Sequence, residues 1–385
     1  MRRNVALGRL LEWLSSLKLT LVCLALLMIL VVACTLAQVN LGIHLAVERF
    51  IRSFIVWWSP EGSSLRLPVF PGGGLVGGIL LLNLIFAQFR RLEWSWRKGG
   101  IWIVHIGLAL LFIGEFATAL MQVESHMDIE EGQTKSFSED YRHMEVAVVD
   151  ETAAEFNDEL GIPDSVMKTR AEITDASLPF KLRVHAYHDN AALSMRAPGA
   201  PPSLVTAGVG AGMSFQPQPP VTADDDQNTA VAVVEPVLKD GTSLGVFLLS
   251  NGLGAPQGFL LEGHKWKLAL RLRRYQHPFA LMLKDFRHDV YPGTDIPKNF
   301  SSLVRLIDPR SGDDRDVLIY MNSPLRHGGL TFYQASFGKN DTLSVLQVVR
   351  NPAWTLPYLS CLLVALGLLW HFGLMLRKSL GARSL

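Results

Sequence analysis

Residues 101–121 read IWIVHIGLALLFIGEFATALM, and residues 353–376 read AWTLPYLSCLLVALGLLWHFGLML. A bilayer core about 30 Å thick needs about 20 apolar residues in a helix, and both stretches have that length. Two further apolar stretches, roughly 17–38 and 67–89, lie before them, whereas 122–352 is rich in Asp, Glu, Pro and Gly. The sequence therefore predicts four transmembrane helices, with a large domain between the third and the fourth.

The positions of the basic residues predict the orientation of these helices. Basic clusters precede the first helix, fill the short loop between the second and third, and follow the fourth. Their members are Arg2, Arg3, Arg9, Arg90, Arg91, Arg97, Lys98, Arg377, Lys378 and Arg383. By the positive-inside rule all of these clusters are cytoplasmic. We therefore expect a protein of the cell inner (cytoplasmic) membrane, with both termini cytoplasmic. Its parts are an N-terminal membrane region over 1–121, an extracytoplasmic domain over 122–352, and a fourth helix with a cytoplasmic tail over 353–385.

Composition excludes several classes of function. Hydrophobic residues make up 49% of the chain, the mean hydropathy is +0.23 and the net charge is +1. A near-neutral chain without a basic stripe argues against nucleic acid as a partner. The sequence has no Gly-rich phosphate loop, no GxSxG and no HExxH motif, so nothing indicates a hydrolase or a nucleotide-driven pump.

The three cysteines, Cys23, Cys34 and Cys361, all lie in apolar stretches. The external domain has no cysteine, so it depends on a hydrophobic core rather than on disulfides. No CxxC motif is present, which argues against thiol–disulfide exchange by this chain. Cys34 follows Val31-Val32-Ala33, a pattern similar to a lipoprotein signal. Lipidation of Cys34 stays open, although we expect an uncleaved first helix with a small interior thiol.

The external domain has the pattern of short β-strands. Residues 180–186, FKLRVHA, alternate apolar and polar side chains with period two, as a half-buried strand does. Turn-forming pairs such as Asn251-Gly252 and Pro292-Gly293 separate such runs. The other runs lie at 229–237, 244–250, 265–275, 279–287, 301–308, 315–321, 329–337 and 342–350. The predicted fold class is membrane α plus β, with a mainly antiparallel sandwich or open barrel outside the membrane. The stretch 195–228, rich in Pro, Gly, Ala and Asp, predicts a loop.

Two histidines lie within the predicted membrane helices, where polar groups are costly and usually face a partner, a cavity or a cofactor. His105 and His371 are each a few residues inside the cytoplasmic end of their helix. Two imidazoles at one depth can ligate a heme iron from both faces, and Arg97 and Lys98 can then hold the heme propionates. Alternatively, each histidine bonds a carbonyl oxygen or reaches the membrane interface.

Two other polar residues, Asn83 and Glu115, lie in the second and third predicted helices. Asn83 predicts a hydrogen bond between helices. Glu115 is ten residues beyond His105, which is roughly 15 Å along a helix and too far to share a ligand shell. We expect Glu115 to be a protonated helix-contact residue.

Two blocks near the end of the external domain carry the strongest local signal. Residues 285–302 read DFRHDVYPGTDIPKNFSS, and residues 321–338 read MNSPLRHGGLTFYQASFG. Here the chain resembles the ResB family of system II cytochrome c biogenesis. The resemblance extends to the order of the four helices, to Leu17-Lys18-Leu19-Thr20, to the histidine of the third helix and to Ile129-Glu130-Glu131-Gly132. Residues 135–280 carry little of it.

The resemblance implies an accessory, non-catalytic subunit of the complex that exports heme and attaches it covalently to apocytochrome c. His105 matches the family's transmembrane heme ligand, so heme b is the implied cargo, held transiently. The implied partners are the lipid bilayer, apocytochrome c, a thioredoxin-like thiol reductant and a ResC (CcsA)-type membrane subunit that supplies the opposite iron ligand. If the partner supplies the opposite iron ligand, His371 is not needed for that position, so its role stays open. Trp57-Trp58 is too short for a Trp-rich heme-handling loop, so we expect heme attachment on the partner.

Other functions stay open at the level of sequence. One is a membrane scaffold that positions a partner synthase and apocytochrome c without binding heme. Another is a quinone-linked electron-transfer subunit, which ranks last because only one intramembrane histidine pair is present. The 285–338 blocks are expected to be mostly structural, with the Asn322 amide bonding backbone in a tight loop. Tyr333 and Gln334 alternate on a strand, so one of them should face the core.

Overall fold

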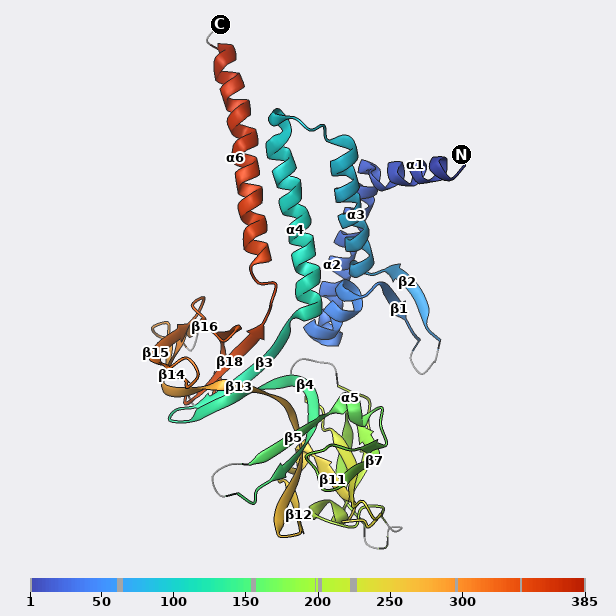
Figure 1. The fold of residues 1–385 in the computed structure, drawn as a ribbon, viewed down its shortest axis with the longest axis vertical. Helices are drawn as coiled ribbons and strands as arrows, with labels where there is room; N and C mark the ends of the chain where they lie inside the picture. The colour runs from blue at the N-terminus through green and yellow to red at the C-terminus, as the bar shows by residue number, and fades with distance from the viewer. Residues whose placement is uncertain are drawn as a thin grey trace. The chain divides into compact units, whose positions relative to one another are not determined.

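The computed structural model divides the chain into two compact units (Figure 1). A membrane unit contains the residues up to Gln122 and those from Asn351 onward, and a β unit lies between Val123 and Arg350. The structure describes residues 2–60, 65–153, 157–197, 199, 203–221, 227–294, 297–339 and 341–383.

The membrane unit is helical, as the apolar stretches predict. Among the described residues, four helices are long and apolar enough to cross a membrane. They are α2 Leu17–Ala46, α3 Gly73–Arg91, α4 Gly99–Met121 and α6 Leu356–Arg383. A further helix, α1 Arg2–Leu14, precedes α2, and Ser16 caps the start of α2 by accepting a hydrogen bond from the Lys18 backbone. The chain therefore has the helices of a multi-pass membrane protein.

The second long helix begins later than its apolar stretch. The sequence predicts a helix from about 67, but Leu67–Pro71 form strand β2, antiparallel to β1 Ile55–Trp58. Pro68 and Pro71 lack the backbone N–H that a helix interior needs. The helix therefore begins only after Gly72, whose extended backbone forms the N-cap.

The first long helix is longer than predicted. α2 continues past residue 38 to Ala46 with a break at Gly42, whose backbone is not helical (φ 74°), and the π-helical turn η1 Val47–Arg52 follows it. Cys23 and Cys34 are buried, as interior thiols would be, whereas Cys361 is exposed on α6.

The strands of the β unit pair antiparallel into one large sheet and two smaller ones. The large sheet has ten strands, with the order β15-β14-β13-β4-β3-β18-β17-β16 and with β5 and β12 paired at its side. Their bounds are β3 Val123–Glu130, β4 Thr134–Asp150, β5 Asp158–Pro163, β12 Gln257–Leu261, β13 His264–Val290, β14 Pro297–Asp308, β15 Asp313–Tyr320, β16 Leu325–His327, β17 Leu330–Gly338 and β18 Leu343–Arg350.

The second sheet has the order β11-β10-β7-β6, and the third pairs β8 with β9. Their bounds are β6 Glu172–Ile173, β7 Lys181–His188, β8 Ala191–Met195, β9 Met213–Pro217, β10 Val231–Val237 and β11 Phe247–Ser250. The short helix α5 Asp164–Met167 follows β5.

Strand β13 runs through two hydrophobic cores. Its first half buries Trp266 and Leu268 in one core, together with residues of the second sheet. Its second half buries Phe279 and Leu281 in the other core, together with β14, β17 and β18. The alternation of buried and exposed side chains along each half is what the period-two pattern predicts.

The ends of the large sheet lie close to each other. β15 ends at Tyr320 and β16 begins at Leu325, so the first and last strands of the sheet order are joined by a short turn. The sheet must therefore curl around the second core. This half of the β unit is an open barrel, one of the two architectures that the strand pattern predicts.

Two of the strand predictions are wrong in detail. The runs 265–275 and 279–287 are one strand, because Pro278 lies where the register between β13 and β4 shifts and so removes no ladder hydrogen bond. The expected loop 195–228 contains β9, whose short apolar run is hidden among Gly and Pro residues. The described residues do not include 198, 200–202 and 222–226 of that stretch.

Candidate functional site

His105 lies in α4, and its imidazole is oriented by its own helix. The Nδ1 atom lies 2.8 Å from the Ile101 carbonyl oxygen. Because a carbonyl oxygen only accepts, Nδ1 carries a proton, so that in the neutral imidazole Nε2 has the lone pair. Metal-binding histidines are commonly oriented by such a bond from the other ring nitrogen. The carbonyl bond expected for an ordinary helix histidine is thus present, and it leaves Nε2 able to ligate iron.

Helix α4 packs against α6 through Gly100, Gly107 and Gly114, which are buried and spaced seven residues apart. A Cβ atom on Gly100 would lie 2.5 Å from the Gly367 carbonyl oxygen and 3.0 Å from the His371 Cβ atom. Small residues in one row allow two helix backbones to approach this closely. His371 therefore lies against the α6-facing side of α4.

His105 lies on a different side of α4. It is five residues beyond Gly100, which corresponds to a rotation of roughly 140° about the helix axis. The two histidines are thus not brought together on one face. Among the described residues, no group of three His, Cys, Asp or Glu side chains is placed to hold a metal ion. The heme site predicted from the sequence takes one imidazole, that of His105, from this chain.

The short loop before α4 holds the two basic residues predicted to meet heme propionates. The Arg97 side chain is exposed, and the Lys98 Nζ atom lies 2.7 Å from Glu93 Oε2. The hydrogen bond from Lys98 lowers the pKa of Glu93. Lys98 is therefore engaged within the chain, whereas Arg97 points to solvent.

Aromatic residues hold this loop against the helices. The rings of Trp94 and Trp102 meet edge to face at 5.0 Å, and those of Trp96 and Trp370 do so at 4.5 Å. Gln88 of α3, which the sequence did not single out, donates from Nε2 to the Trp102 carbonyl oxygen at 3.3 Å. The Gln88 Oε1 atom is buried without a hydrogen-bond partner among the described residues. The sequence signal that could have identified Gln88 is that it is, after Asn83, a second polar residue in the apolar stretch 67–89.

Asn83 joins α1, α2 and α3. Its Nδ2 donates to the Leu14 and Ser16 carbonyl oxygens at 2.6 Å and 3.0 Å, and its Oδ1 accepts from Thr20 Oγ1 at 2.6 Å. The predicted hydrogen bond between helices is confirmed. Glu115, by contrast, is exposed on α4, and the helix contact expected for it stays a prediction.

The first block, 285–302, packs its aromatic side chains against the second block. Phe286 and Phe300 lie 5.9 Å and 5.3 Å from the Phe337 ring. The turn after β3 is tied to the same block, because Glu131 Oε1 accepts from the Phe286 backbone N–H at 2.8 Å. Residues 295 and 296 of the block lie outside the described residues. The resembling segments therefore meet in one core, around the end of β13.

The second block, 321–338, corrects one prediction and confirms another. Asn322 is exposed with φ 63°, and its amide makes no hydrogen bond among the described residues. The left-handed backbone, which Asn tolerates better than most residues, accounts for its place in the turn. On β17, Gln334 faces inward and its Oε1 accepts from Ser302 Oγ at 2.6 Å, whereas Tyr333 is exposed.

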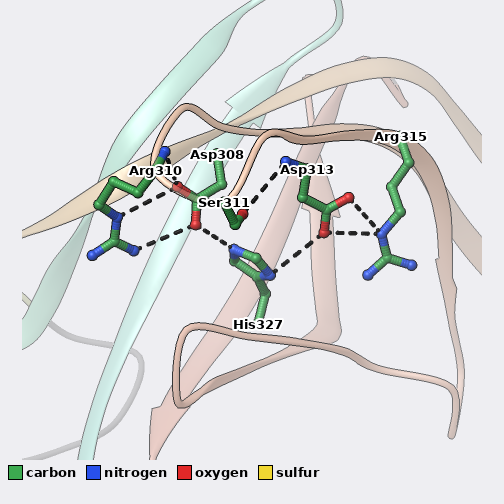
Figure 2. Close-up of polar contacts among 6 residues, drawn as sticks. All are labelled: Asp308, Arg310, Ser311, Asp313, Arg315 and His327. Carbon is green, nitrogen blue, oxygen red and sulfur yellow. Dashed lines mark hydrogen bonds and ion pairs between the residues drawn. The ribbon is translucent and has the colours of Figure 1, made fainter.

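Figure 2 shows that His327 of the second block is flanked by two carboxylates. His327 Nε2 lies 2.9 Å from Asp308 Oδ2, and Nδ1 lies 3.9 Å from Asp313 Oδ2. Arg310 and Arg315 pair with the same carboxylates from the other side. The hydrogen bond from His327 lowers the pKa of Asp308 well below its ordinary range. This cluster links β14, β15 and β16.

Both blocks fall within residues 257–345, which match the ResB-like family. This region is ResB-like. The resemblance read from the two blocks is therefore confirmed. Protein NrfI of Wolinella succinogenes is 36% identical over 94 residues, which is 24% of this chain and 10% of that protein. The match thus spans about a tenth of that relative's length. In this chain the ResB-like region runs from β12 into β18.

Proposed function

We propose that this chain acts in cytochrome c biogenesis as an accessory, heme-binding membrane subunit. The ResB-like region, residues 257–345, supports a role in cytochrome c biogenesis. The observation that carries the heme assignment is the His105 imidazole, whose Nδ1–H is bound to Ile101 and whose Nε2 keeps its lone pair. A neutral imidazole can ligate iron without bringing a charge into a dry site.

Heme is the cargo of this mechanism. It enters from the cytoplasmic side, binds through His105 against a ligand of a ResC (CcsA)-type partner, and moves outward within the complex. Arg97 is free to meet one propionate at the entrance. Lys98 meets the other by exchanging its exposed carboxylate partner Glu93, because exposed ion pairs contribute little to stability. No acid or base from this chain is required for these steps.

The β unit then holds the partner and apocytochrome c, so that reduced cysteine thiols meet the heme vinyl groups. A thioredoxin-like reductant keeps those thiols reduced. The covalent chemistry belongs to the partner.

The test is a pyridine hemochrome assay with a visible spectrum on the purified full chain, alone and with its partner. His105→Ala should lose most of the bound heme and remain folded in the membrane. His44→Ala, an exposed histidine of α2, is the matched control and should keep the heme. An unchanged spectrum and full cytochrome yield in His105→Ala would replace this function by that of a scaffold that binds no heme.

The orientation of the chain belongs to the same proposal. The basic clusters place both termini in the cytoplasm and the β unit outside. A reporter enzyme that is active only in the cytoplasm should therefore be active when it is fused after Leu385. Alkaline phosphatase activity from that fusion would reverse the route proposed for heme.

A further inference from the structure

Helix α1 does not continue straight into α2. It ends at Leu14, and α2 begins after the Ser16 cap. The Asn83 side chain of α3 donates to the Leu14 and Ser16 carbonyl oxygens, one on each side of this elbow. Figure 1 shows that α1 runs crosswise to α3. A helix held perpendicular to membrane-spanning helices lies along the membrane surface.

The polar side of α1 is bound to the last turns of α3. Arg90 lies one residue before the end of α3, and its guanidinium donates to the Gly8 carbonyl oxygen at 3.3 Å and to Glu12 Oε1 at 2.9 Å. Gly8 and Glu12 are four residues apart, so they lie on one side of α1. Asn83, which holds the elbow, is two turns earlier on α3. α1 is therefore at the depth of the last turns of α3, where a spanning helix reaches the membrane surface.

The opposite side of α1 is apolar and exposed. Leu10 and Trp13 are three residues apart and lie roughly 150° around the helix from the side that meets Arg90. Their side chains are 52% and 55% exposed. Leu17 and Leu21, in the first turns of α2, are exposed as well, so the exposed apolar side chains continue onto a helix that can span the membrane. The lipid that covers α2 can therefore cover Leu10 and Trp13 too.

Positive charge lies beside this apolar side. Arg9 is exposed and has no acidic partner among the described residues. It is four residues before Trp13, so the two side chains are neighbours on the helix surface. The sequence of α1 contains three arginines and a single acid, Glu12, which is paired with Arg90. Arginine next to exposed Trp and Leu on an amphipathic helix is the pattern of binding to anionic lipids.

We propose that α1 lies in the membrane surface and binds the head groups of anionic phospholipids through Arg9. Leu10 and Trp13 enter the boundary of the acyl chains, while the Arg9 guanidinium stays at the level of the phosphates and pairs with them. The polar side, which Arg90 holds, faces away from the acyl chains. This binding involves neither His105 nor heme, so it is independent of the proposed function.

The experiment places the full chain in phosphatidylcholine nanodiscs and measures how brominated lipids quench Trp13 fluorescence. The difference between the wild type and Trp13→Phe gives the Trp13 signal. Equal small fractions of brominated phosphatidylglycerol and brominated phosphatidylcholine are compared. Both should quench Trp13, because it contacts acyl chains. The anionic lipid should be enriched about fivefold at Trp13, as expected for one basic residue near the lipid surface.

The variants separate charge from apolar contact. Arg9→Gln should abolish the preference for phosphatidylglycerol but keep the quenching by both lipids, and Arg9→Lys, which retains the charge, should keep the preference. Arg377→Gln, an exposed cation of α6, is the matched control and should quench as the wild type does.

Three results would overturn the proposal. Absence of quenching by either lipid would mean that protein or water, rather than lipid, covers Trp13. Equal quenching by the two lipids in the wild type would mean that Arg9 selects no anionic head group. An equal loss of preference in Arg377→Gln would assign the preference to the whole membrane face instead of α1. None of these results would change the heme spectrum of His105→Ala.

Discussion

His327 Nε2 lies 2.9 Å from Asp308 Oδ2, so a side chain of β16 is bonded to the last residue of β14 (Figure 2). This contact joins β16, the last strand of the sheet order, to β14, the second strand, and so ties the two edges of the open barrel together. The bond from His327 lowers the pKa of Asp308. The stability that Asp308 contributes is therefore present above its ordinary pKa of about 4 and is lost as the pH falls through the lowered value.

His327→Ala should lower the thermal midpoint of the β unit by several degrees at neutral pH. The substitution leaves the buried Asp308 carboxylate without its closest partner, and breaking a buried pair is more costly than losing an exposed one. Calorimetry of the full chain in detergent measures the midpoint. Arg315→Gln is the control, because it removes only a partly exposed pair with Asp313 and should leave the midpoint nearly unchanged. A wild-type midpoint in His327→Ala would show that the barrel closes without this contact.

Asn322 should tolerate Gly but not a β-branched residue. Its φ of 63° is left-handed, and its side chain makes no hydrogen bond among the described residues. Asn322→Gly should keep the wild-type level of folded protein, whereas Asn322→Val should lose about 1–2 kcal/mol of stability. Quantitative immunoblotting of the membrane fraction measures the level. If both variants are abundant but cytochrome c maturation fails, Asn322 contacts a partner instead.

His277 should make the β unit sensitive to mild acid. Burial lowers its pKa to about 4, and its Nε2 lies 2.9 Å from Ser138 Oγ. The ordinary value is about 6.5, so the unfolded chain takes up the proton first as the pH falls. The contribution of His277 to the free energy of unfolding is thus complete only well above pH 6.5. Because the ring is partly exposed, that free energy should fall by about 1–2 kcal/mol between pH 7 and pH 4.

The matched variants for this titration are His277→Gln and His143→Gln. Reversible chemical unfolding in micelles at several pH values measures how the free energy of unfolding changes with pH. In His277→Gln this free energy should change less between pH 7 and pH 4. His143 has the opposite sign, because its hydrogen bond to Asp164 raises its pKa, so that its contribution is lost as the pH rises. If His277→Gln loses as much stability in acid as the wild type does, other titrating groups cause that loss.

Gly100 should be intolerant of any side chain. A Cβ atom there would lie 2.5 Å from the Gly367 oxygen and 2.7 Å from the His371 backbone nitrogen, and neither backbone atom can move aside alone. Gly100→Ala should separate α4 from α6 and lower the thermal midpoint of the membrane unit. Gly78→Ala on α3 is the control, because a Cβ atom there meets nothing within 4 Å. Equal midpoints in the two variants would show that the glycine row is not required.

Hydropathy predicted the four helices, because it depends on composition over several turns. It could not predict that Leu67–Pro71 pair as a strand, since the proline content of that segment decides it. Period-two patterns found most of the late strands. They could not join the two halves of β13 across Pro278, because that depends on the register with β4.

At the candidate site, the sequence could place His105 in its helix but not its orientation. The bond from Nδ1 to Ile101 is a property of the rotamer, and the side that His371 occupies depends on how α6 packs on Gly100.

The two membrane histidines should differ in their effect on heme. His105→Ala removes a lone-pair donor, so heme bound to the complex with the ResC (CcsA)-type partner should be lost, and added imidazole should fill the vacated position and restore part of the cytochrome c yield. His371→Ala should have a much smaller effect. His371 belongs to α6 and packs against Gly100 of α4, whereas His105 lies on a different side of α4. The double variant should be no worse than His105→Ala. The visible spectrum and the cytochrome c yield of each variant measure this. Equal losses in the two single variants would mean that both imidazoles ligate one iron, which would require α6 to rotate on the Gly100 row.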